Sequence, residues 1–258
     1  MTIRTWYWAA GLIDPRESWA RQIHTSLEFM PLFLSLGRDC YFVENGAVPS
    51  RCGIVACAEG PDSVDLATDA EKKVDDAVTA LSITESVRYR ASLLAYSIDS
   101  PPAQFMPRKS DVYRQSAYGR RPPLTTEGGD RVKLWYQLLR SARPNLDKNL
   151  RSARALEAVV EGITDNSKMS GIHLYRGIEE ISKCFGGWEK AGQTLGLPSK
   201  FYRPVERARR VVAHALNEDT VPNKSQLEMA TETLPDARQT SLTVLEAFLK
   251  HVSGTNED

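Results

Sequence analysis

The sequence predicts an α+β fold, in which a small N-terminal mixed α/β module precedes an all-α helical bundle. Before residue 100, short runs of aromatic and β-branched residues end at turn-forming residues, which is typical of strands. After residue 129, apolar residues recur at intervals of three and four, which is typical of helices. We therefore divide the chain into a module at 1–100, a Pro/Gly/Arg-rich linker or loop at 101–129 and a helical domain at 130–252.

Four short segments of the N-terminal module have the composition of strands: Trp6–Ile13, Cys40–Val43, Arg51–Ala58 and Val87–Ile98. Between the last two, Asp65–Leu81 carries apolar residues at helical spacing. A helix that is apolar on one side must bury that side against another element. The pattern therefore predicts a small sheet with at least one helix covering it.

The linker is rich in residues that interrupt both helices and strands. Arg120 and Arg121 precede two prolines, and the pair Gly128–Gly129 follows a few residues later. The stretch Arg108–Arg143 contains nine basic residues against three acidic ones. We consider two interpretations of this charge, a solvated connector and a flexible basic arm that contacts phosphates without reading sequence.

Helical spacing continues through the second half, with short connections that are typical of a compact bundle. Asp130 has the character of an N-cap, and Pro204 occupies a first-turn position that proline tolerates. The predicted helices are one that begins at Asp130, then Leu146–Ile163, Leu174–Phe185, Trp188–Leu195, Pro204–Leu216 and Pro235–Val252.

The net charge of the chain and the distribution of its apolar residues indicate which partners and which cellular location to expect. The chain has 33 basic and 33 acidic residues, so its net charge predicts neither a nucleic-acid nor a membrane partner. It has no run of about eighteen apolar residues that would cross a membrane, and its aromatic N-terminus lacks the pattern of a secretion signal. We therefore expect a cytoplasmic protein with reduced cysteines.

The sequence contains no pattern that predicts a cofactor. Of its four cysteines, only Cys52 and Cys57 lie close together, whereas a structural zinc site usually takes two close pairs. There is no nucleotide-binding loop and no Gly-x-Ser-x-Gly turn. We therefore expect neither a metal nor another cofactor.

The helical domain resembles the HEPN superfamily in the order of its motifs over about 130–252. A helix with a central glutamate pair is followed by a Gly-Gly break, then by a basic helix that leads from arginine to histidine, and then by a closing helix. The residues that carry this resemblance are Leu174–Ile181, Phe185–Trp188, Leu195–Leu197, Glu206–Ala215 and Leu245–Leu249.

The resemblance implies an RNA-directed protein, a candidate metal-independent endoribonuclease of a bacterial defence or toxin-like system, which acts as a homodimer. HEPN nucleases carry an arginine followed, after four to six residues, by a histidine; here those roles fall on His214 with Arg207 or Arg209. In that chemistry a base removes the 2′-hydroxyl proton while cations stabilise the charge on the phosphate. Ala208 stands where nucleolytic members commonly have a polar residue, so a non-catalytic module that binds a partner or dimerises is the alternative.

Helix geometry selects among these arginines. At about 100° per residue, Arg207 lies roughly 20° from His214 around the helix, and Arg210 lies about 40° from it. Arg209 lies about 140° away. We therefore predict Arg207, Arg210 and His214 as the catalytic group. Further nucleic-acid contacts are predicted at Arg203, Arg209, Arg120 and Arg121.

The segment 188–210 allows a different interpretation. It is similar to a helix-turn-helix, with Phe201–Arg210 as the helix that reads DNA. Pro198 and Pro204 are equally consistent with a tight bend between two helices of a bundle. A DNA-binding regulator is therefore a further alternative.

Overall fold

The structure is a computed structural model, and the chain divides into two compact units, Met1–Gln137 and Leu138–Asp258. The residues that it describes are 3–10, 32–36, 40–44, 52–60, 63–86, 88–89, 92–98, 106–107, 126–165, 167, 169–217 and 224–254.

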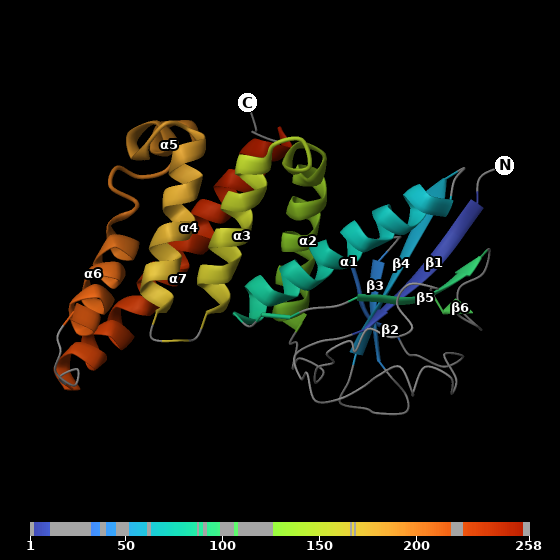
Figure 1. Cartoon of the computed structure of the whole chain (residues 1–258), viewed down its shortest axis with the longest axis horizontal. Helices are drawn as coiled ribbons and strands as arrows, with labels where there is room; N and C mark the ends of the chain where they lie inside the picture. The colour runs from blue at the N-terminus through green and yellow to red at the C-terminus, as the bar shows by residue number, and fades with distance from the viewer. Residues whose placement is uncertain are drawn as a thin grey trace. The chain divides into compact units, whose positions relative to one another are not determined.

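The first unit contains a β-sheet (Figure 1). Its described strands are β1 (Ile3–Ala10), β2 (Leu32–Ser35), β3 (Cys40–Glu44), β4 (Cys52–Gly60), β5 (Ser92–Ile98) and β6 (Met106–Pro107). They pair in the order β2-β3-β4-β1-β5-β6, and each described pair is antiparallel. Strand β1 therefore lies inside the sheet, although it is first in the chain.

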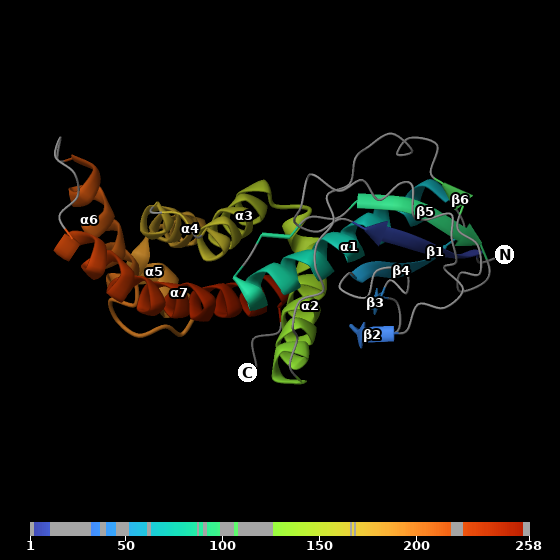
Figure 2. The same cartoon turned by 90° about the horizontal axis from the view of Figure 1, so that it is seen from below.

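Helix α1 (Ser63–Glu85) connects β4 to β5, which flank β1 on either side. Because β4 and β5 are both antiparallel to β1, they run in the same direction, and β4–α1–β5 forms a split β-α-β unit. The helix packs on β4 (Figures 1 and 2). Its buried apolar residues have helical spacing and include Leu66, Ala70, Val74, Ala77 and Leu81.

Two charged side chains of α1 are buried in the first unit. Lys73 is 8% exposed and Asp76 is fully buried. The Lys73 ammonium donates to the carbonyl oxygen of Cys57 at 2.5 Å and pairs with Asp69 at 2.9 Å. A buried charge is tolerated only when it is paired and hydrogen-bonded, and the bond from Lys73 to Cys57 joins α1 to β4.

Four of the described strands, β1, β3, β4 and β5, overlap predicted segments but differ from them in their bounds. Strand β1 begins three residues before the predicted Trp6, and residues 11–13 of that predicted segment lie outside the described residues. Strands β3, β4 and β5 overlap the predicted segments, whereas β2 and β6 have no predicted counterpart. Strand β6 lies inside the predicted linker. Residues 108–125 of that linker, including Arg120 and Arg121, lie outside the described residues.

The predicted linker extends too far toward the C-terminus. Helix α2 (Thr126–Leu146) begins four residues before the predicted Asp130 and includes Gly128 and Gly129. Glycine costs about 1 kcal/mol relative to alanine within a helix. The buried side of α2 offsets that cost, since Val132, Trp135, Tyr136, Leu139, Ala142 and Leu146 are all at most 6% exposed.

The second unit is helical, as the sequence predicts. After α2 its helices are α3 (Leu150–Thr164), α4 (Ser170–Cys184), α5 (Trp188–Thr194), α6 (Arg203–Asn217) and α7 (Lys224–Ser253). None of the helices in the described part of the chain is long and apolar enough to cross a membrane.

Helices α3 and α4 pack closely because glycines stand at their contact. A Cβ atom added to Gly177 would lie 2.6 Å from the Cα of Val159, and one added to Gly162 would lie 2.8 Å from the Cα of Leu174. Each helix also has a strongly apolar stripe facing the core. Its buried members are Leu156, Val159 and Ile163 from α3, and Leu174, Ile178 and Ile181 from α4.

Two helix boundaries were predicted wrongly. Leu146 ends α2 rather than beginning the next helix, because Asn149 caps α3 through its side chain. Pro235 lies inside α7 rather than at its first turn. Proline removes one helix hydrogen bond, but the residues that follow it, Ala237, Val244 and Leu245, are buried and hold the helix against the core.

Candidate nucleic-acid interface

Helix α6 is strongly amphipathic, which determines which of its arginines reach solvent. Val205, Ala208 and Val212 are at most 4% exposed and face the bundle. A Cβ atom on Gly171 of α4 would lie 2.8 Å from the carbonyl oxygen of Ala208, so α4 and α6 are in close contact. With this side buried, residues on the opposite side of α6 are exposed.

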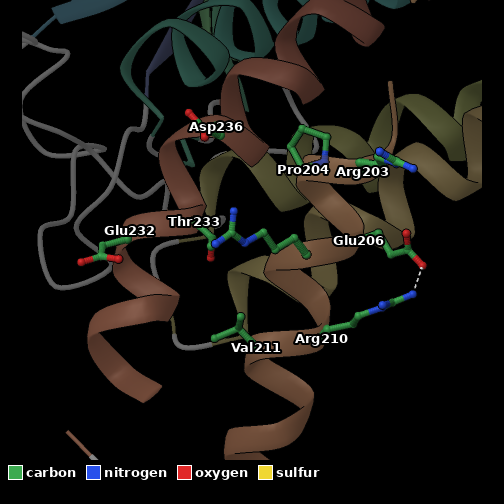
Figure 3. A pocket seen from close by; sticks show the side chains of 9 residues that line it. Arg203, Pro204, Glu206, Arg210, Val211, Glu232, Thr233 and Asp236 are labelled. Atoms are coloured by element: carbon green, nitrogen blue, oxygen red, sulfur yellow. Dashed lines mark hydrogen bonds and ion pairs between the residues drawn. The ribbon is translucent and has the colours of Figure 1, made fainter. Parts of the chain in front are cut away.

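The exposed side of α6 forms one wall of an open groove, and α7 forms the other. The groove has a volume of about 760 Å³. Its lining residues are Arg203, Pro204, Glu206, Arg207, Arg210 and Val211 from α6, and Glu232, Thr233 and Asp236 from α7 (Figure 3). We call it the α6–α7 groove. The spacing of Arg203, Arg207 and Arg210 places them within about 60° of one another around the helix.

Carboxylates accompany these arginines. Arg210 is paired with Glu206 one turn earlier, with 2.6 Å between the guanidinium Nη2 and the carboxylate Oε1 (Figure 3). The Arg210 side chain is nevertheless 65% exposed. Glu232 and Asp236 are exposed on the facing helix. The described residues that line the groove therefore include three arginines and three carboxylates.

Arg209 has different surroundings from its neighbours on α6. Its guanidinium carbon lies 4.2 Å from the centre of the Tyr175 ring on α4, a cation–π contact. Its Nε is buried and has no hydrogen-bond partner among the described residues. Arg209 does not line the α6–α7 groove, so the structure separates it from Arg203, Arg207 and Arg210 and packs it between helices.

The predicted residues are thus brought together only in part. Arg203, Arg207 and Arg210 share one groove, as the helix geometry predicts for the last two. His214 lies in α6 one turn beyond Arg210, but its side chain is outside the described residues. Arg120 and Arg121 are also outside them.

Two of the three acidic residues of the groove, Glu232 and Asp236, were not predicted from the sequence. Glu206 and Arg210 are four residues apart on a helix, a spacing that commonly forms ion pairs, so the sequence did contain a signal for that pair. Glu232 and Asp236 had no such signal. They reach the groove only because α7 packs beside α6.

The structure also bears on the helix-turn-helix alternative. Eight residues, 195–202, separate the end of α5 from the start of α6. The turn of a helix-turn-helix usually has three or four residues. The connection between α5 and α6 is therefore longer than this motif requires.

Within the described part of the chain, no group of three or more His, Cys, Asp or Glu side chains is placed to hold a metal ion. Cys184, on α4, is partly buried, and this burial raises the pKa of its thiol despite an opposing hydrogen bond from Ser152. Its thiol donates to the carbonyl oxygen of Glu180 at 3.4 Å. These contacts are those of a structural thiol rather than an activated one.

Comparisons of this chain with models of protein families, with curated proteins and with solved structures found no match.

Proposed function

We propose that the α6–α7 groove binds RNA phosphates, and that the helical unit is a HEPN-like, metal-independent endoribonuclease of a bacterial defence or toxin-like system. The observation that carries this proposal is the row Arg203, Arg207 and Arg210, which lines a single open groove. Guanidinium groups bind phosphate with two parallel hydrogen bonds, and three of them in one row suit a nucleic-acid backbone.

The carboxylates of the groove do not prevent phosphate binding. An exposed ion pair such as Glu206–Arg210 contributes only about 0–1 kcal/mol, so a phosphate can replace Glu206 as the partner of Arg210. His214 is the proposed general base and takes the proton of the 2′-hydroxyl. The 2′-oxygen then bonds to the adjacent phosphorus, the bond from phosphorus to the 5′-oxygen breaks, and the 5′-oxygen takes a proton from water. Arg207 and Arg210 stabilise the added negative charge.

The test is cleavage of a mixed RNA pool in the presence of EDTA. We compare the wild type with His214→Ala, Arg207→Ala and a matched control, Arg154→Ala, since Arg154 is exposed on α3 and outside the groove. We expect His214→Ala to abolish cleavage, and Arg207→Ala to slow it by about 100-fold or more because one stabilising cation is lost. Arg154→Ala is expected to cleave like the wild type. Cleavage that survives His214→Ala, in a folded protein, would show that the reaction takes place elsewhere.

The equal number of arginines and carboxylates favours a second candidate, a non-catalytic HEPN-like module that binds a protein partner or a second copy of this chain. A surface with both charges matches another protein surface of mixed charge. The dependence of RNA affinity on salt concentration distinguishes the two candidate functions. If three arginines contact single-stranded RNA phosphates, affinity falls roughly 20-fold between 50 and 200 mM salt. Binding of RNA without cleavage, or a dimer with no RNA affinity, would favour the binding module.

A further inference from the structure

A second hollow lies where α5 leads into α6, and it is lined by aromatic rings. Its volume is about 500 Å³, within the usual range for a small-ligand site. Its lining residues are Trp188, Glu189, Gly192, Gln193, Leu197, Pro198, Ser199, Lys200, Phe201 and Tyr202. We call it the aromatic pocket.

The three rings of the aromatic pocket contact one another and remain partly exposed. The ring centroids of Trp188 and Tyr202 are 4.8 Å apart, and those of Trp188 and Phe201 are 6.0 Å apart. Phe201 and Tyr202 meet edge to face at 5.9 Å. None of the three rings is fully buried. They therefore offer apolar, flat surface to a ligand.

Ring contacts and backbone hydrogen bonds with neighbouring residues fix the shape of the aromatic pocket. Trp188 packs on Tyr175 at 5.8 Å, and Tyr175 is in turn covered by Arg209. Gly192 lies beside Phe201, since a Cβ built on it would be 3.4 Å from the ring, an ordinary contact distance. Backbone hydrogen bonds close the connection, including Leu197 to Gly192 at 2.8 Å. A site that is already rigid loses little entropy when a ligand binds.

The charged and polar residues that line the aromatic pocket indicate which kind of flat ligand it binds. Lys200 lines the pocket, is exposed, and has a left-handed backbone conformation with φ of 63°. Lys200 supplies a positive charge for a phosphate of the ligand, and Glu189 brings one negative charge to the same pocket. Gln193 and Glu189 add hydrogen-bonding groups at the edge. Aromatic surface beside a cation is the combination that binds single-stranded nucleic acid.

The position of the aromatic pocket connects it with the α6–α7 groove. Tyr202 lines the pocket, and the next residue, Arg203, lines the groove. We propose that the aromatic pocket stacks one unpaired base of an RNA strand, with the adjoining phosphates at Lys200 and Arg203, so that the backbone continues along Arg207 and Arg210. This inference rests on the proposed function, because it takes RNA as the ligand of the groove.

The test compares a labelled ten-nucleotide single strand with a ten-base-pair RNA duplex by fluorescence anisotropy. Tyr202→Leu removes a stacking ring, and we expect it to weaken single-strand binding by about 5- to 100-fold while leaving duplex binding unchanged. Lys200→Gly suits the left-handed backbone, so it removes a charge without strain and is expected to reduce the salt dependence of single-strand binding. Lys190→Ala, exposed on α5 and outside the pocket, is the control. Single-strand affinity of folded Tyr202→Leu within about twofold of the wild type, a difference of about 0.4 kcal/mol, would overturn the inference.

A second readout separates this inference from the proposed function. Adenosine monophosphate, used as a probe, is expected to quench tryptophan fluorescence in the wild type but not in Trp188→Phe, which keeps a ring at that position. The chain has five tryptophans, so the substitution is needed to assign the signal. If Arg207→Ala abolishes RNA binding and Tyr202→Leu changes nothing, the pocket is excluded and the groove stands. If the nucleotide quenches Trp188 while Arg207→Ala binds RNA normally, the groove is excluded and the pocket stands.

Discussion

Arg207 and Arg209 are two residues apart on α6, yet their surroundings have nothing in common. Arg207 lines the open groove, whereas Arg209 is half-buried and stacks on Tyr175 of α4. The difference follows from the angle of about 200° between them around the helix. A basic run in a sequence is therefore not one surface, and each arginine of α6 has to be tested separately.

Gly177 sets the distance between α3 and α4. A side chain here would meet backbone atoms, the Cα and nitrogen of Val159 at 2.6 and 2.8 Å. We predict that Gly177→Ala lowers the free energy of unfolding by about 1–3 kcal/mol, because overpacking outweighs the gain in helix propensity. Urea denaturation measures this change in the free energy of unfolding. Gly192→Ala is the control, since its Cβ would be no closer than 3.4 Å to the Phe201 ring and 3.9 Å to the Leu197 carbonyl oxygen, and equal stability of the two variants would contradict the prediction.

The first residue of helix α3 is determined by a single side chain, that of Asn149. The side chain of Asn149 accepts hydrogen bonds from the backbone nitrogens of Arg151 and Ser152, at 3.1 and 3.2 Å. These two groups have no partner within the helix. Asn149 therefore ends the connection from α2 and begins α3, although the apolar stripe of the sequence continues from Leu146.

We predict that Asn149→Ala lowers the free energy of unfolding by about 1 kcal/mol, because two backbone donors lose their acceptor. Asn149→Asp keeps an acceptor at the same place and is expected to retain the stability of the wild type. Thermal denaturation followed by circular dichroism compares the three proteins. A loss in Asn149→Asp as large as that in Asn149→Ala would show that the cap is not the cause.

For the whole molecule, the division into two units places both proposed RNA contacts in one of them. The α6–α7 groove and the aromatic pocket consist of residues 188–236 and belong to the second unit. None of the described residues of the first unit lines either site. The proposed RNA contacts in the described part of the chain therefore all come from the second unit.

A fragment of residues 126–258, which retains all of α2, is therefore expected to unfold cooperatively and to bind RNA like the full chain. We expect its affinity to lie within about threefold of the full-length value, a difference of about 0.7 kcal/mol. Circular dichroism checks the folding and anisotropy checks the binding. A folded fragment that has lost its RNA affinity would show that the first unit takes part in binding.

The sequence by itself determined that the second unit is helical, although not where each helix begins and ends, and it determined the angular positions of the arginines on α6. Both are properties of one element, because a turn of about 3.6 residues fixes which side chains share a face. Only the tertiary structure decided that α7 brings Glu232 and Asp236 opposite Arg207, that Arg209 packs on Tyr175, and that Trp188 meets Tyr202. These contacts join residues of different elements, and they depend on how helices pack together, which the spacing of residues along one helix does not encode.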